Sequence, residues 1–99
     1  MLHTYWEFQV KPDKLVEFER RYGSQGDWAT LFRRAAGYHG TTLGRSTGAK
    51  GHYLLTDTWD HAESFAAFKN AFRDAYEELD KLCESLTIEE KHIGNFEVI

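Results

Sequence analysis

The 99-residue sequence contains a single cysteine, Cys83, which excludes an internal disulfide bond. It also lacks any run that approaches the roughly 20 apolar residues needed to span a bilayer. Its N-terminus shows no basic segment followed by an apolar run and a small-residue cleavage site, as a secretory signal would. These absences predict a cytoplasmic protein with no membrane partner.

Basic residues are not clustered anywhere in the chain, whose formal net charge is −4. The local basic pairs, Arg20-Arg21 and Arg33-Arg34, lie within helical patterns, where a solvated helix face is the simplest interpretation. Because phosphate binding needs a concentrated positive surface, we do not expect the protein to bind nucleic acid.

No linker rich in proline, glycine or serine divides the chain, so residues 1–99 are expected to form a single domain. A chain this short buries about two thirds of the surface that its unfolded form exposes, which leaves a modest core. Aromatic residues make up 15% of the sequence. This share is generous for such a core, and some of these residues are available for a ligand pocket or a subunit interface.

Alternating apolar and polar residues predict four strands. Residues 2–10 alternate between an apolar face and an amphipathic face. Residues 38–46 are rich in threonine and interrupted by glycine, and with residues 52–59 they predict a β-hairpin around a turn at residues 47–51. The last strand is expected at residues 93–99.

Apolar residues three and four positions apart predict helices between these strands. A first helix opens at Pro12 and is broken by residues 23–26, after which a second helix follows and ends at Gly37. The clearest pattern predicts one continuous helix over residues 60–86. Thr87 and the glutamate three residues later repeat a capping-box pattern, which predicts a short extra helical turn.

The resulting order is βα-ββ-αβ. Because crossover connections are right-handed, this order predicts an α+β, ferredoxin-like βαββαβ sandwich with a four-stranded antiparallel sheet and all helices on one face. The other face of the sheet would be bare and would carry apolar and aromatic groups among polar ones. Covering it with the same face of a second copy is the simplest solution, so we expect a homodimer.

With this order in hand, the sequence resembles a known family. The residues that carry the resemblance are the strand Tyr5-Trp6-Glu7-Phe8, the pair Lys11-Pro12, the strand end Leu55-Thr56-Asp57-Thr58-Trp59-Asp60 and the phenylalanine-rich helix after it. Together they are similar to the antibiotic biosynthesis monooxygenase family of the dimeric α+β barrel superfamily.

The resemblance implies a function. Members include small dimeric oxygenases that oxidise aromatic polyketides or quinols with no flavin, haem or metal, by removing a proton and letting the substrate carbanion react with oxygen. Other members degrade haem and share an asparagine on the first strand, a tryptophan at the end of the third and a histidine on the next helix. Trp59 matches that tryptophan, but the first strand has Tyr5 and Glu7 instead, and residues 62–84 contain no histidine. Haem degradation is therefore not expected, and the resemblance to the cofactor-independent oxygenases implies that no cofactor is bound.

Proton abstraction needs a base whose pKa lies near neutrality. Glu7 and Asp57 are carboxylates within strands, an uncommon location for acids unless they are paired, hydrated or used. His39 is a third candidate, and it is predicted to lie near His52 across the hairpin. Each has a plainer interpretation, which is an ion pair with a residue such as Arg45 or simple exposure on a strand.

The five histidines are scattered through the sequence, and none shows the spacing of a zinc site. We therefore expect no bound metal. They are His3, His39, His52, His61 and His92.

Several aromatic residues are candidates for binding a flat substrate. Tyr5, Tyr53 and Trp59 combine a ring with a polar group that can orient substrate oxygens. Phe65 and Phe68 fall on the core face of the long predicted helix, where they are available to border a cavity. The alternative for all five is packing within the core or across a dimer.

Three functions remain open at this point. The leading hypothesis is a cofactor-independent monooxygenase that acts on an aromatic or quinol-type metabolite. The second is a non-catalytic dimeric domain that binds a small molecule, and the third is a structural domain whose aromatic residues are all committed to packing.

Overall fold

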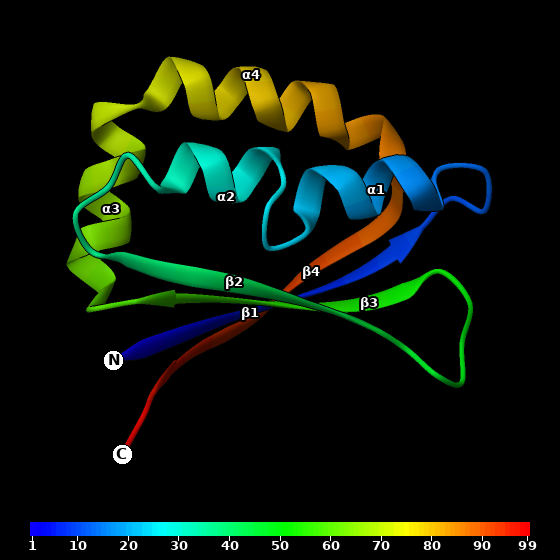
Figure 1. Cartoon of the computed structure of the whole chain (residues 1–99), viewed down its shortest axis with the longest axis horizontal. Helices are drawn as coiled ribbons and strands as arrows, with labels where there is room; N and C mark the ends of the chain where they lie inside the picture. Colours follow the sequence, from blue (N-terminus) through cyan, green and yellow to red (C-terminus); the bar gives the residue numbers. More distant parts are fainter.

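The computed structural model describes all residues 1–99 and shows a four-stranded antiparallel sheet with every helix on one face (Figure 1). The strand order is β2-β3-β1-β4. This arrangement confirms the ferredoxin-like fold predicted from the sequence. In chain order the elements are β1 (Leu2–Val10), α1 (Leu15–Tyr22), α2 (Asp27–Phe32), β2 (Tyr38–Arg45), β3 (His52–Trp59), α3 (Ala62–Ala71), α4 (Arg73–Cys83), the 3-10 helix η1 (Glu84–Leu86) and β4 (Thr87–Glu97).

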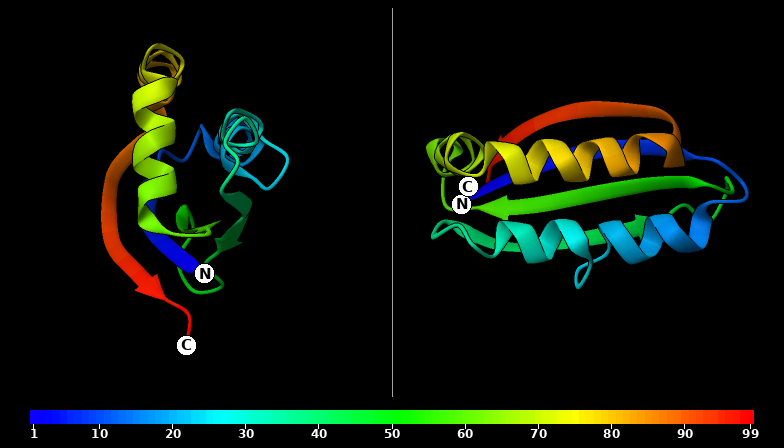
Figure 2. Two further views of the ribbon diagram at one scale, coloured as in Figure 1. Left: turned by 90° about the vertical axis from the view of Figure 1, so that its left-hand side faces the viewer. Right: turned by 90° about the horizontal axis from the view of Figure 1, so that it is seen from above.

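The two faces of the sheet differ as the alternation predicts. On β1, Phe8 and Val10 point toward the helices and are buried. On β3, the buried positions are Tyr53, Leu55 and Asp57, followed by Trp59 at the strand end. The residues between them point to the opposite face, which no helix covers (Figure 2).

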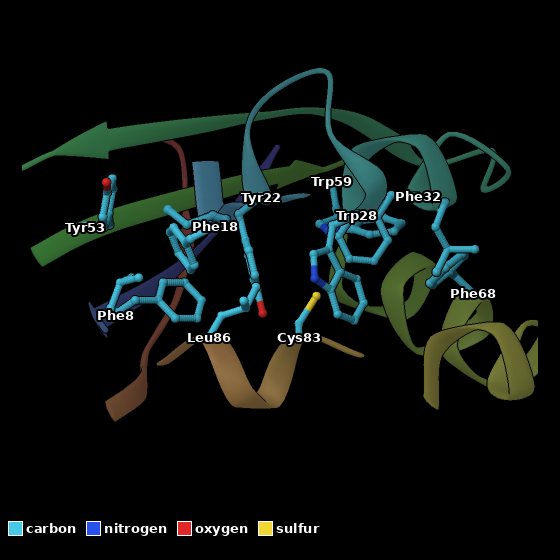
Figure 3. Close-up of a cluster of buried hydrophobic side chains, with 13 residues drawn as sticks. Phe8, Phe18, Tyr22, Trp28, Phe32, Tyr53, Trp59, Phe68, Cys83 and Leu86 are labelled. Atoms are coloured by element: carbon cyan, nitrogen blue, oxygen red, sulfur yellow. The ribbon is translucent and has the colours of Figure 1, made fainter. Parts of the chain in front are cut away.

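Aromatic rings fill the space between the helices and the sheet. Figure 2 shows α1 and α2 end to end beside α4 on the same side of the sheet. Phe18 of α1 stacks on Tyr22 with 4.3 Å between ring centroids, and Phe32 of α2 meets Trp59 edge to face at 5.5 Å. Figure 3 shows Phe18 beside Phe8 and Tyr53 in one half of the core, and Trp59 beside Phe32 in the other. Cys83 is buried with them, as expected for a small apolar side chain.

The prediction of one continuous helix over residues 60–86 is wrong. The helix breaks at Phe72, whose φ of −116° and ψ of 35° leave the helical region. Figure 1 shows α3 and α4 running in different directions on either side of this residue. The break brings the ring centroids of Phe65 and Tyr76 to within 6.4 Å of each other, whereas a straight helix would separate the two residues by about 16 Å along its axis.

The predicted start of the last strand is also wrong. The segment from Thr87 onward forms no helical turn, because Thr87 already pairs with Val10 of β1 and the pairing continues to Glu97 opposite Leu2. Two irregularities in the β1–β4 register accommodate the longer strand. Pairing with the central strand therefore outweighs the local capping pattern.

Phe18 provides a test of the core. It is fully buried, so Phe18→Ala is expected to lower the free energy of unfolding by about 3–5 kcal/mol in urea denaturation. Val16 lies on the same helix and is 85% exposed, so Val16→Ala is expected to change that free energy by less than about 0.5 kcal/mol. Equal effects of the two substitutions would contradict this packing.

Candidate functional site

A cavity of about 60 Å³ lies between the sheet and the helices. Strands β1, β3 and β4 form its floor, and residues of α1 to α4 form its walls and roof. Its lining is mainly aromatic, with Trp6, Trp28, Phe32, Trp59, Phe65 and Tyr76 among the contributing side chains. These flat apolar faces match an aromatic ring in character, but about 60 Å³ is less than the roughly 150 Å³ of a cavity that holds benzene, so side chains around the cavity must move to admit a ring.

One carboxylate lies inside this aromatic enclosure. Asp57 of β3 is 7% exposed and points to the helix side of the sheet, between Leu55 and Trp59. Burial raises the pKa of Asp57 to about 6, because removal from water disfavours the charged form. Its carboxyl group therefore changes charge close to neutral pH.

Asp57 is held by a chain of hydroxyl groups on β2. Thr41 pairs with Asp57 across the β2–β3 register, and its Oγ1 donates a hydrogen bond of 2.6 Å to Asp57 Oδ1. The Thr41 hydrogen is thereby used, so the Tyr38 hydroxyl donates to Thr41 Oγ1 at 2.5 Å. The bond from Thr41 favours the charged carboxylate and keeps the pKa of Asp57 from rising further.

The second oxygen of Asp57 is free. No side chain or backbone group of the protein donates to Oδ2, although Asp57 lines the cavity. On the other side of β3, Thr4 of β1 pairs with Asp57 and also lines the cavity. One oxygen is thus fixed by the protein, and the other is available to a bound molecule.

The cavity opens between α4 and β4. Its exposed lining residues are Asp80 of α4 and Glu90 of β4. Partial burial and the nearby Asp80 raise the pKa of Glu90. Tyr76 lies deeper on α4, and burial, together with the charges of Asp80, Glu90 and Asp57, raises the pKa of its hydroxyl to about 12. Tyr76 is therefore a neutral hydrogen-bond donor at neutral pH.

Three of the residues singled out in the sequence line this cavity. They are Asp57, Trp59 and Phe65. Phe68 is buried beside them, with its ring centroid 5.9 Å from that of Trp59, but it belongs to the packed core behind the cavity wall.

Two candidates lie on the opposite face of the sheet. Glu7 Oε2 is 2.9 Å from His52 Nε2, and its ion pair is with this histidine rather than with Arg45. Tyr5 packs edge to face on Phe96 of β4 at 5.5 Å between ring centroids. Neither side chain reaches the cavity, because alternate residues of β1 point to opposite sides.

The other two candidates lie at the ends of the hairpin. His39 is exposed at an irregularity between Tyr38 and Gly40, so the prediction that it neighbours His52 is wrong. Tyr53 is buried on the helix face, but its hydroxyl donates to Glu19 Oε2 at 2.5 Å, away from the cavity.

The sequence interpretation missed several cavity residues. Thr41 and Tyr38 support Asp57 from β2, and Tyr76 faces it from α4. Trp28 of α2 also lines the cavity, and its buried Nε1 has no hydrogen-bond partner. The one available signal was Thr41, because threonine beside an in-strand acid is a suitable donor if the register aligns the two.

Two further properties of the structure bear on binding. No group of three or more histidine, cysteine, aspartate or glutamate side chains is arranged to hold a metal ion. None of the helices has both the length and the apolar character required to traverse a bilayer.

Comparison with known proteins places the chain in a family. The sequence profile described as antibiotic biosynthesis monooxygenase matches residues 1–81. No curated protein sequence matches the chain.

Solved structures share the fold over almost the whole chain. A variant of SnoaB, a cofactor-independent oxygenase from Streptomyces nogalater, is 20% identical with a TM-score of 0.80, covering 98% of this chain and 91% of its own. A protein from Bordetella bronchiseptica is 22% identical with a TM-score of 0.77, covering 99% and 96%. One from Nitrosomonas europaea is 16% identical with a TM-score of 0.73, covering 100% and 99%. The structural likeness establishes the fold, and the profile match establishes that the chain belongs to the antibiotic biosynthesis monooxygenase family.

Proposed function

We propose that this protein is a cofactor-independent monooxygenase that oxidises an aromatic or quinol-type metabolite in the cavity above β3. The observation that carries the proposal is Asp57, a buried carboxylate that lines an aromatic cavity and has one oxygen held by Thr41 and the other without a protein donor. Membership of the family and the SnoaB-like fold support the same reaction class.

Asp57 is the proposed general base. With a pKa of about 6 it is mostly ionised at neutral pH and still basic enough to accept a proton from a phenol or an activated carbon. Glu7 and His39 are not chosen because neither lines the cavity. Tyr76 is placed to donate a hydrogen bond to a substrate oxygen, and Trp59, Trp28 and Phe65 enclose the ring.

The reaction then balances without a further reductant. Asp57 Oδ2 takes a proton from the substrate, and the resulting anion supplies the electrons for a carbon–oxygen bond to dioxygen. Return of the proton gives a hydroperoxide, whose O–O bond breaks as the same carbon loses its remaining hydrogen. The substrate carbon becomes a carbonyl, and the second oxygen atom leaves as water.

We further propose that the protein is a homodimer that pairs through the bare face of the sheet. That face has no helix over it and carries Tyr5, Leu54 and Phe96, of which Leu54 is 42% and Phe96 53% exposed. A patch of this kind on a small protein is commonly an interface.

Removal of the proposed base tests the reaction. Asp57→Asn is expected to reduce oxygen uptake with a quinol substrate by roughly a hundredfold or more, the usual effect of losing a general base. In the native protein, kcat/KM is expected to rise with pH through about 6, because the carboxylate form is the active one. Full activity of Asp57→Asn, with native circular dichroism, would rule Asp57 out; binding of quinols without any oxygen uptake would favour a non-catalytic binding domain.

Thr41 tests how Asp57 is tuned. Thr41→Val removes the hydrogen bond that favours the carboxylate, so the pKa of Asp57 is expected to rise and the acidic limb of the pH–rate profile to move to higher pH. Titration of the Asp57 carboxyl carbon by NMR measures the same shift without turnover. Thr42→Val is the matched control, because Thr42 is exposed on the other face of β2. An unchanged profile in Thr41→Val would contradict the arrangement.

Sedimentation velocity tests the dimer. A charge at the centre of the proposed interface is unfavourable, so Leu54→Asp is expected to shift the protein from dimer to monomer at micromolar concentration. Val16→Asp adds the same charge to an exposed site on the helix side and is expected to leave the dimer intact. A monomeric native protein under these conditions would contradict the proposal.

A further inference from the structure

The charged side chains that line the cavity are all acidic. Asp57 lies at its base, and Asp80 and Glu90 lie at its opening. No lysine, arginine or histidine contributes to the lining. The negative charge of the cavity is therefore not neutralised from within.

A lysine and a histidine contact two of the lining rings without lining the cavity themselves. Lys69 Nζ is 4.8 Å from the ring centroid of Tyr76, and the lysine belongs to a separate surface hollow on α3 and α4. His92 of β4 pairs with Trp6 across the sheet, and its exposed ring lies 4.7 Å from that of Trp6 between centroids. Lys69 and His92 each contact a ring that lines the cavity, but neither residue lines the cavity itself.

The aromatic rings of the cavity also favour a positively charged ligand. The π faces of Trp6, Trp28 and Trp59 carry partial negative charge and attract cations, most strongly where water is excluded. A carboxylate at the opening beside such rings is a typical arrangement for binding an organic ammonium group. An anionic ligand would meet repulsion from the opening, the base and the walls alike.

From this distribution we infer that the cavity selects aromatic ligands that carry a protonated amine, with the ammonium group at Asp80 and Glu90 and the ring hydroxyl at Asp57. The inference rests on the cavity that the proposed function uses, and it specifies the charge of the substrate. The aromatic walls lie between buried Asp57 and the two exposed carboxylates, so a ring bound there would have one end toward each. Carboxylated or sulfated aromatic compounds are expected to bind more weakly than their cationic counterparts.

Three para-substituted phenols that share a two-carbon chain and differ in the charge of its end group test this inference. Tyramine is cationic, para-ethylphenol is neutral and para-hydroxyphenylpropionate is anionic near neutral pH. Binding to the native protein, measured by calorimetric titration at low ionic strength, is expected to follow that order, with a Kd for the cation about tenfold below that for the anion. Added salt is expected to reduce the ratio, since Asp80 and Glu90 are exposed to solvent.

Matched variants locate the effect. In the double variant Asp80→Asn/Glu90→Gln, the ratio of the two Kd values is expected to fall toward one. The control Glu77→Gln/Glu89→Gln makes the same change in net charge on the same two elements, but Glu77 and Glu89 do not line the cavity. The control is expected to keep the native ratio.

Three results would overturn the inference. They are binding of the anion as tightly as the cation, binding of none of the three phenols, and equal loss of selectivity in the control variant. The titration involves no turnover, so its outcome is independent of oxygen uptake. Selective binding of tyramine in a protein that consumes no oxygen would support the inference and contradict the proposed function.

Discussion

The hydrogen bond from Thr41 to Asp57 depends on the register of β2 against β3, and the site depends on that register. Side chains alternate between the faces of a sheet, so a slip of one residue in β3 would move Asp57 to the bare face and bring a neighbouring threonine beneath the helices. The aromatic residues Tyr53 and Trp59 on the same face make such a slip unfavourable, because both would leave the core. The residues that bury the strand thus also fix the position of the carboxylate.

Burial of the Asp57 carboxylate has an unfavourable free energy, and its hydrogen bond from Thr41 offsets that free energy only in part. Thr41 satisfies one oxygen, while Oδ2 faces a cavity instead of a donor. A fully satisfied Asp57 would have a low pKa and would be a weak base. An apolar residue in place of Asp57 would pack better but could not accept a proton. The incomplete compensation is what places the pKa of Asp57 at about 6, within the range where a carboxylate can exchange protons with a substrate.

The sequence predicted which residues share a face of a strand better than it predicted which residues pair between two strands. Period-two alternation correctly grouped Asp57 with Leu55 and Trp59, because that pattern is a property of one strand. The contact with Thr41 depends on pairing between two strands, and alternation within either strand does not determine the pairing. The break at Phe72 was also missed, because neither proline nor glycine marks it and it follows from packing of α3 and α4 on different partners. Cavity residues such as Tyr76 depend on that break.

Glu7 and Asp57 show why the face of a strand matters more than the type of residue. Both are acids on adjacent central strands, and alternation within each strand does not show whether the two carboxylates lie on the same face of the sheet. Glu7 lies on the bare face, where His52 binds its carboxylate and no aromatic enclosure surrounds it. Asp57 lies under the helices among rings that exclude water. An acid on the buried face contradicts the apolar pattern of its own strand, and such local contradictions are expected where a residue is retained for chemistry and not for packing.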